Sequence, residues 1–232
     1  MEDKSKNIKG LYLTSVEFLE DYICFDKGET FNFKPGLNLL VGDQSAGKST
    51  LLQILTKQIN LKVDIKTTGP VSFFFFDTEK DNPRSVQSIE YSKDPMTVLQ
   101  SKFQSHGEAL LPFILSLKQA KDTIIFIDEP EAGLSIRSQL KVVEAIKKAV
   151  SNGAQIVLST HSYFIIQMAE EVLSLEHKKW MNSNDFIETQ KQDVIKKEKK
   201  TKSKKISKEY KERKTESSKD MNSIINGFMD LF

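Results

Sequence analysis

The stretch that decides the fold reads Gly42-Asp43-Gln44-Ser45-Ala46-Gly47-Lys48-Ser49. It fits the pattern G-x-x-x-x-G-K-[ST], in which backbone N–H groups and a helix N-terminus hold phosphate groups. In that pattern the lysine binds the β- and γ-phosphates, and the serine hydroxyl binds Mg²⁺. We therefore predict that this loop, with Thr50 next to it, binds the phosphates of a nucleotide.

The sequence on both sides of this loop has the character that such a site requires. Leu37-Asn38-Leu39-Leu40-Val41 is a short apolar run typical of a buried strand, and residues 50–55 continue as a helix. The alternative is a glycine-rich loop that binds no nucleotide. Such a loop rarely lies between a strand and a helix, so we favour the phosphate-binding interpretation.

Strand-like and helix-like segments alternate along the chain, as judged from β-branched runs and from helical spacing of apolar residues. Strands are expected at residues 11–18, 22–25, 30–33, 37–41, 71–76, 123–127, 155–159 and 172–175. Helices are expected at residues 50–55, 109–120, 136–150 and 164–169. The alternation predicts an α/β domain with a mainly parallel central sheet.

Polar residues follow two of the predicted strands. Asp128 and Glu129 come directly after the apolar run 123–127, and His161 follows residues 156–160. The carboxyl ends of strands in open α/β sheets gather ligands. Asp128 could therefore hold Mg²⁺ through water, Glu129 could polarise an attacking water, and His161 could contact the γ-phosphate. The alternatives are two solvated carboxylates and an incidental histidine.

Composition limits the other possibilities. The chain has 232 residues, of which 38% are hydrophobic and 28% charged. It lacks an apolar run of the roughly 18 residues that a membrane span needs, and residues 1–9 do not resemble a signal peptide. We therefore expect a cytoplasmic protein without membrane insertion. Cys24 is the single cysteine, which excludes an internal disulfide and a cysteine-rich zinc site.

The order of four motifs resembles that of the ABC ATPase superfamily over residues 11–175. The motifs are the phosphate loop, a signature at Ser105-His106-Gly107-Glu108, the stretch Asp128-Glu129-Pro130-Glu131 and His161. Residues 105–108 and 128–135 are similar to those of small, uncharacterised AAA-family ATPases of bacteria and phages, close to the RecF and SMC branch. Two positions differ from the common pattern, because His106 replaces a glycine and Ser135 replaces the D-loop aspartate.

The resemblance implies a P-loop fold with an N-terminal antiparallel β part, and ATP and Mg²⁺ as cofactors. Lys48, Glu129 and His161 would be catalytic, and Ser49 and Asp128 would hold the metal. The resemblance also implies an ATP-dependent homodimer, in which Ser105 and Gly107 of one subunit reach the γ-phosphate bound to the other. An ordinary helix start is the alternative interpretation of residues 105–108.

Two family elements cannot be assigned from the sequence. The Q-loop could be formed by Asp77-Thr78-Glu79 or by Gln87. The aromatic residue that stacks on adenine could be Phe18, Tyr22 or Phe25.

The C-terminal part of the sequence is strongly basic. Residues 190–219 (Gln190 to Lys219) hold 13 Lys or Arg and 5 Asp or Glu. We predict an ATPase domain at 1–187, a disordered basic linker at 188–219 and an apolar docking segment at 220–232. The linker could attract DNA or RNA phosphates, or be merely solvated. Phe228 to Phe232 resembles peptides that bind replication sliding clamps, and docking onto its own domain is the alternative.

We predict an ATPase that dimerises around ATP and acts in nucleic-acid maintenance or defence. The alternatives are the nucleotide-binding subunit of a membrane transporter and a non-catalytic, ATP-dependent switch that recruits a partner. Only 56 residues lie between Lys48 and Ser105. This interval leaves no room for the long coiled-coil arm of an SMC protein, and little for the helical subdomain of a transporter ATPase.

Overall fold

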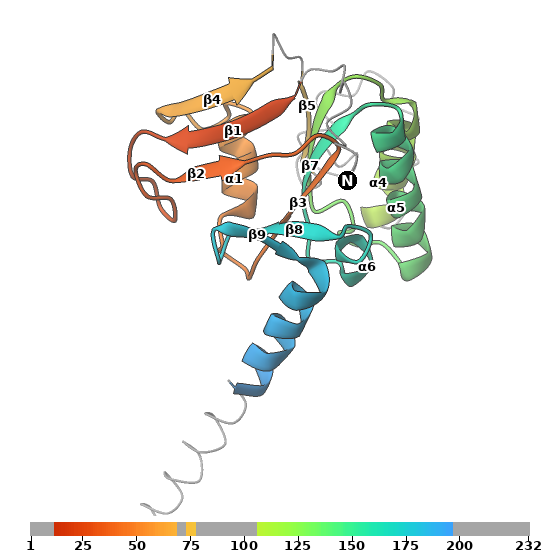
Figure 1. Ribbon diagram of the computed structural model, residues 1–232. Coiled ribbons are helices and arrows are strands. Elements are labelled where there is room, and N and C mark those ends of the chain that lie inside the picture. Colours follow the sequence, from red (N-terminus) through yellow and green to blue (C-terminus); the bar gives the residue numbers. More distant parts are fainter. Residues whose placement is uncertain (1–11, 69–72, 78–105, 197–232) are drawn as a thin grey trace, which may run out of the picture. The chain divides into compact units, whose positions relative to one another are not determined.

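The computed structural model describes residues 12–68, 73–77 and 106–196, and the structural statements below refer to these residues. The chain forms two compact units, Met1–Asn184 and Asp185–Phe232. The first unit contains all the labelled elements of Figure 1.

Strands and helices are interspersed along the described part of the first unit. The strands are β1 (Leu13–Phe18), β2 (Thr30–Asn32), β3 (Leu37–Val41), β4 (Val63–Thr67), β5 (Phe73–Asp77), β6 (Ile124–Asp128), β7 (Gln155–Ser159), β8 (Glu171–Ser174) and β9 (Lys179–Asn182). The helices are α1 (Lys48–Leu55), α4 (His106–Ser116), the short 3₁₀ helix η1 (Leu117–Gln119), α5 (Ile136–Ser151) and α6 (Tyr163–Ile166).

The strands form two sheets. The larger has the order β5-β6-β7-β3-β8-β9, in which neighbouring strands from β5 to β8 are parallel and β9 is antiparallel to β8. The smaller is the antiparallel sheet β2-β1-β4. The predicted α/β fold, with a mainly parallel central sheet and an N-terminal antiparallel part, is therefore confirmed.

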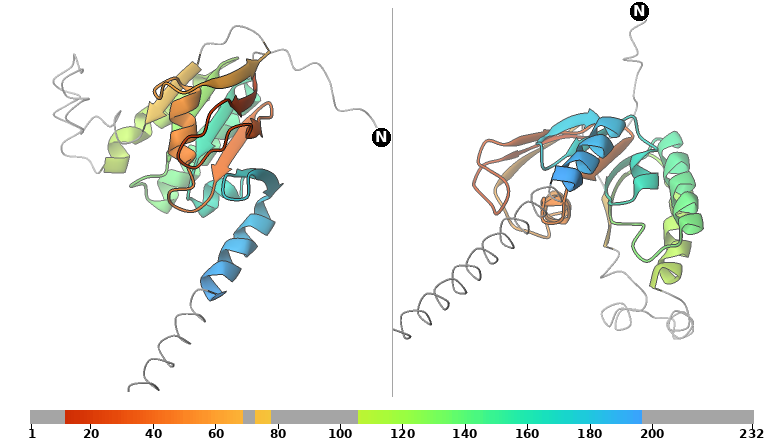
Figure 2. Two further views of the ribbon diagram at one scale, coloured as in Figure 1. Left: turned by 90° about the vertical axis from the view of Figure 1, so that its left-hand side faces the viewer. Right: turned by 90° about the horizontal axis from the view of Figure 1, so that it is seen from below.

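Helix α1 lies in the main apolar core. It contacts β6 and β7, while α5 packs on β7 from the opposite face of the larger sheet (Figure 2). The core around α1 combines buried side chains from both sheets and from the helix itself, including Phe18, Phe31, Leu51, Leu52 and Val157. Complete burial of such a side chain contributes about 1.5–3 kcal/mol. This packing fixes the first turn of α1 against the carboxyl ends of β6 and β7.

Helix α5 shows how the sequence encodes one layer. Ser135 caps its N-terminus, because the serine hydroxyl accepts a hydrogen bond from Ser138 N. The helix buries a stripe of apolar residues at the spacing of one helical face, namely Val142, Ala145, Ile146 and Ala149. The two sheets are joined by the fully buried Gln155, whose amide bonds the backbone of Leu13 and Lys34.

Two local predictions differ from the structure, and two strands were not predicted. Residues 22–25, expected to be a strand, form a tight turn in which Tyr22 and Phe25 exchange backbone hydrogen bonds of 2.9 and 2.8 Å. The expected helix at 164–169 is shorter and begins earlier, at Tyr163. Strands β4 and β9 were not anticipated, because both are short and largely exposed and thus lack an apolar run.

The described part of the second unit is helical. Residues 183–196 are helical, so the helix crosses the predicted boundary at 187 and 188 and includes the first nine residues of the predicted linker. Residues 197–232, with the rest of that linker and the apolar segment, lie outside the described residues. Within the described residues, every helix is too short or too polar to cross a membrane.

Candidate functional site

The phosphate loop joins β3 to α1 and depends on two glycines with positive φ. Gly42 has φ 148° and Gly47 has φ 88°. A Cβ atom on Gly47 would overlap Cys24 Sγ and lie 2.9 Å from Phe25 Cζ. The loop therefore packs against the 22–25 turn so closely that a side chain at position 47 is excluded.

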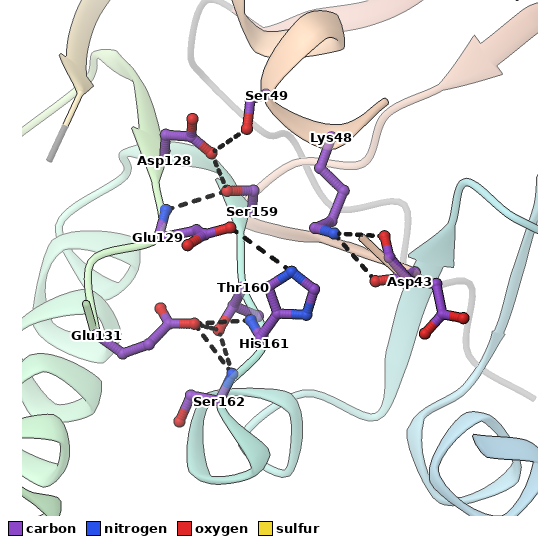
Figure 3. A network of polar contacts seen from close by, with 11 residues as sticks. Asp43, Lys48, Ser49, Asp128, Glu129, Glu131, Ser159, Thr160, His161 and Ser162 are labelled. Carbon is purple, nitrogen blue, oxygen red and sulfur yellow. Dashed lines mark hydrogen bonds and ion pairs between the residues drawn. The ribbon is translucent and has the colours of Figure 1, made fainter. Parts of the chain in front are cut away.

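Lys48 is almost fully buried, with 5% of its surface exposed. Its Nζ donates hydrogen bonds of 3.0 Å to the carbonyl oxygens of Gly42 and Asp43 (Figure 3). Burial lowers the pKa of Lys48, and the nearby carboxylates of Glu129 and Asp128 oppose that shift. A buried ammonium held by two carbonyl oxygens gains from an anionic ligand, as the phosphate-binding prediction requires.

Ser49 and Asp128 face each other across the site. Ser49 Oγ donates to Asp128 Oδ1 at 3.1 Å, and Ser159 Oγ donates a short hydrogen bond to the same oxygen. Two adjacent ligands of an octahedral Mg²⁺ ion are about 2.9 Å apart when each is 2.0–2.1 Å from the metal. The hydroxyl and the carboxylate therefore fit a shared Mg²⁺. Such an ion commonly takes only one or two protein ligands and completes its shell with phosphates and water.

Glu129 follows β6 in a strained conformation, with φ 46°. Its N–H donates to Ser159 O at 3.2 Å and to Ser159 Oγ at 3.0 Å. Its Oε1 lies 3.6 Å from His161 Nε2, and the two side chains are 41% and 43% exposed. Burial raises the pKa of Glu129, and Asp128 adds to that increase whereas His161 opposes it. A carboxylate with a raised pKa in such a position is suited to accept a proton from water.

Glu131 bonds the loop that carries His161. Its Oε1 accepts hydrogen bonds from Thr160 Oγ1 at 2.7 Å, His161 N at 2.7 Å and Ser162 N at 3.0 Å (Figure 3). The sequence placed Glu131 in a motif but assigned it no role. These three hydrogen bonds form only because the fold brings the loop after β6 next to the loop after β7. The acidic stretch itself was the only signal that could have indicated it.

The structure brings five of the predicted residues together, with the rest of the phosphate loop beside them. Those that converge are Lys48, Ser49, Asp128, Glu129 and His161. The exposed tip of the phosphate loop carries Asp43, Gln44 and Ser45, followed by the half-buried Ala46 and Thr50. Gly107 lies in the first turn of α4, and Ser105 lies outside the described residues.

The candidate aromatic residues for adenine differ in exposure. Phe18 and Phe25 are buried in the core and stack on each other, with ring centroids 4.5 Å apart. Tyr22 is half-buried, in the turn that contacts Gly47 through Cys24 and Phe25. The three candidates are thereby reduced to Tyr22, because the two phenylalanines present almost no surface to a ligand.

The candidates for the Q-loop are only partly described. Asp77 ends β5, is buried, and pairs in register with Asp128 of β6. It therefore lies at the same sheet edge as the metal candidates. Thr78, Glu79 and Gln87 lie outside the described residues, so the assignment of the Q-loop stays open.

Comparison with known proteins identifies sequence relatives of this chain. Residues 105–167 match the family described as "AAA domain, putative AbiEii toxin, Type IV TA system". The chain is 25% identical over 222 residues to a "Putative ABC transporter ATP-binding protein" of Pyrococcus horikoshii, covering 75% of this chain and 85% of the relative. It is 38% identical over 74 residues to UvrABC system protein A of Borreliella burgdorferi, covering 31% of this chain and 8% of that protein.

The chain spans only 8% to 14% of the length of the larger curated relatives that it matches. A solved structure described as "An inward-facing conformation of a putative metal-chelate type ABC transporter" superposes with a TM-score of 0.52 and 20% identity. The superposition covers 76% of this chain and 84% of that one. At this level of identity the likeness concerns the fold alone.

Proposed function

The chain has the fold of an ABC-type P-loop ATPase, and on that premise we propose that it binds ATP with Mg²⁺ and hydrolyses it to ADP and phosphate. One observation supports the proposal above all others. Ser49, Asp128, Glu129 and His161 meet at one edge of the sheet, beside the buried Lys48. Phosphoryl transfer requires mainly a lysine, a metal and a carboxylate that positions water. This edge offers the lysine, the carboxylate and, in Ser49 and Asp128, two groups that could hold the metal.

We assign each residue the role that its place supports. Lys48 would exchange its two carbonyl partners for the β- and γ-phosphate oxygens. Ser49 and Asp128 would hold Mg²⁺, which when bound neutralises charge on the phosphates. Glu129 would orient the attacking water and accept its proton, while His161 would contact the γ-phosphate. Tyr22 would stack on the adenine ring.

We further propose that two chains close around ATP. Glu129 and His161 are 41% and 43% exposed, so the site is open to water on one side. A second chain could cover this side with its signature residues Ser105 and Gly107. Light scattering with Glu129→Gln, ATP and Mg²⁺ should then show a dimer, and Ser105→Arg should prevent it. A mass that stays monomeric with ATP would contradict this assembly.

A matched pair of histidine variants tests the hydrolysis proposal. His161 faces Glu129, whereas His177 lies in the exposed turn between β8 and β9. His161→Ala should reduce the rate of phosphate release from ATP by roughly 10- to 100-fold, and His177→Ala should leave it unchanged. Purified chain that releases no phosphate, or equal rates in the two variants, would overturn the proposal.

The biological task has three candidates. Nucleic-acid maintenance or defence is supported by the excess of 8 positive charges over residues 190–219, and its defence part by the family name that matches residues 105–167. A transporter ATP-binding subunit is supported by the Pyrococcus horikoshii relative, of which the chain spans 85%. The chain could also act as a non-catalytic switch, in which case ATP would bind without turnover. Proteins that co-purify with Glu129→Gln in ATP would distinguish these tasks.

The basic region allows a direct test of the nucleic-acid task. If residues 190–219 bind DNA or RNA phosphates, truncation at Glu188 should abolish binding, and log affinity should fall linearly with log salt. If instead Phe228 to Phe232 binds a protein such as a sliding clamp, Leu231→Ala with Phe232→Ala should abolish that contact alone. An unchanged affinity for nucleic acid after truncation would exclude the first hypothesis.

A further inference from the structure

Glu131 connects the two loops that carry the proposed catalytic residues. It lies two residues after Glu129, in a turn where Ala132 N donates to Glu129 O and Leu134 N donates to Glu131 O, both at 3.0 Å. Its carboxylate reaches across to residues 160–162, at the end of β7. The loop after β6 and the loop after β7 are thus joined through one side chain.

The contacts of Glu131 determine where His161 stands. One carboxylate oxygen accepts the N–H of His161 itself and the N–H of the next residue, so the backbone on both sides of the histidine Cα is fixed. Hydrogen bonds to a charged acceptor are roughly twice as strong as neutral ones. Ser162 is held further, because its hydroxyl donates to Gln139 Oε1 of α5 at 2.7 Å. With the backbone fixed, the His161 ring points toward Glu129 (Figure 3).

A third carboxylate beside Asp128 and Glu129 destabilises the fold unless its own contacts compensate for the repulsion. Asp128 and Glu129 already carry negative charge here, and like charges near each other are destabilising in a partly desolvated site. Glu131 Oε2 is also buried, with no hydrogen-bond partner within the described residues. Glu131 therefore carries an energetic cost, which the hydrogen bonds to the His161 loop offset.

We propose that Glu131 is a positioning residue for ATP hydrolysis, which holds His161 against Glu129 by binding the backbone of residues 161–162 and the hydroxyl of Thr160. The inference rests on the proposed function. Its geometric part, the pairing of His161 with Glu129, can be measured without ATP.

Two substitutions separate the hydrogen bonds of Glu131 from its charge. Glu131→Gln keeps an acceptor oxygen at the same reach and places its NH₂ where the unpartnered Oε2 now lies. Glu131→Asp keeps the charge but shortens the side chain by one methylene. Glu131→Gln should hold kcat within about threefold of wild type, whereas Glu131→Asp and Glu131→Ala should lower kcat by roughly 10- to 100-fold with an unchanged KM. Glu144→Ala, on the exposed side of α5, is the control and should change neither constant.

The pairing of His161 with Glu129 can also be measured by NMR on the protein without ATP. The imidazole resonance of His161 is assigned by its loss in His161→Ala. Glu129→Gln should shift this resonance in the wild-type background, because the two side chains are 3.6 Å apart. The shift should disappear in Glu131→Asp and persist in Glu131→Gln. If no ATP is hydrolysed yet this pattern holds, the proposed function fails and the positioning role stands.

Several results would overturn the positioning role. The first is a wild-type kcat together with an intact resonance shift in Glu131→Asp. The second is a Glu131→Gln variant that is as impaired as Glu131→Ala. The third is a loss of kcat that is matched by an equal rise in KM. If Glu131→Ala fails to fold, Glu131→Asp and Glu131→Gln still decide the question.

Discussion

Two lysines of this chain show how the same ammonium group serves different purposes. Lys178, in the turn between β8 and β9, bonds Asp26 Oδ2 and Glu29 Oε2 at 2.9 Å each, and these hydrogen bonds raise its pKa. Lys48 is buried beneath the phosphate loop, forms no ion pair within the described residues, and has a lowered pKa because of burial. A lysine with two carboxylate partners has its charge balanced, whereas Lys48, held by two carbonyl oxygens, is placed to bind an anionic ligand if the proposed function is right.

The largest expected difference between the two lysines concerns ATP binding. Lys48→Ala should weaken ATP binding by roughly 30-fold or more, because loss of one partner of a buried charge pair costs about 2–5 kcal/mol. Lys178→Ala should change the affinity by less than about threefold, as expected for a half-exposed ion pair. Isothermal titration with ATP and Mg²⁺ measures both. Similar losses in the two variants would remove the distinction between them.

A comparison of Gly47 with Gly28 distinguishes the effect of backbone strain from that of steric exclusion. Gly47 and Gly28 have nearly equal φ angles of 88° and 85°, but a Cβ at position 28 meets no atom within 4 Å. Gly28→Ala should therefore lower the free energy of unfolding by only about 1–2 kcal/mol, the cost of the left-handed conformation. Gly47→Ala should cost more and should also weaken ATP binding, since the added methyl group displaces Cys24. Urea unfolding of the two variants provides the comparison, and equal losses would argue against tight packing at Gly47.

A smaller effect is expected for the stability that Lys178 provides. Its pKa in the folded chain lies above the ordinary lysine value of 10.5. The contribution of Lys178 to stability is therefore fully present below pH 10.5 and is lost as the pH rises through the folded pKa. At pH 7, Lys178→Ala should lower the free energy of unfolding by at most about 1 kcal/mol. The highly exposed Lys62 serves as the control. A loss that persists at pH well above the folded pKa would show that packing, not charge, is responsible.

The smallest expected effect is a stabilisation by Glu129→Gln. Because the pKa of Glu129 is raised in the fold, its ionised form destabilises the native state above the unfolded pKa, and this penalty disappears as the pH falls. The variant should therefore melt slightly higher than wild type at pH 7, with a difference that closes toward pH 4.5. Solvent screening keeps the effect small, since the side chain is 41% exposed. A lower melting temperature at pH 7 would contradict the raised pKa.

The sequence predicted the parts of the fold that depend on local pattern. The apolar runs at 123–127 and 155–159 are strands β6 and β7, and the spacing of apolar residues at 136–150 matches α5. Residues 22–25 were wrongly predicted to be a strand. The side chain of Phe25 is buried in the core from within a turn, so its apolar character does not indicate a strand. Strand β4 was not predicted because it has only five residues, most of them exposed, with two apolar side chains that are only partly buried.

The candidate site divides in the same way. Asp128 and His161 could be placed at one sheet edge, since both follow buried strands, but the contacts of Glu131 and Ser159 could not be foreseen. Those contacts join segments about 30 residues apart, and a single sequence does not reveal such pairings. Tyr22 could be chosen among three aromatics only when the burial of Phe18 and Phe25 was known.

The most direct test of the central claim is to measure ATP binding and ATP hydrolysis together in Glu129→Gln. Equilibrium binding of radiolabelled ATP with Mg²⁺ gives the affinity, and the products formed on the same sample give the turnover. We predict an affinity within about threefold of wild type and a turnover reduced by roughly 100-fold or more, as expected when a general base is lost. Wild-type turnover in Glu129→Gln would contradict the assignment of this strand end as the site of hydrolysis.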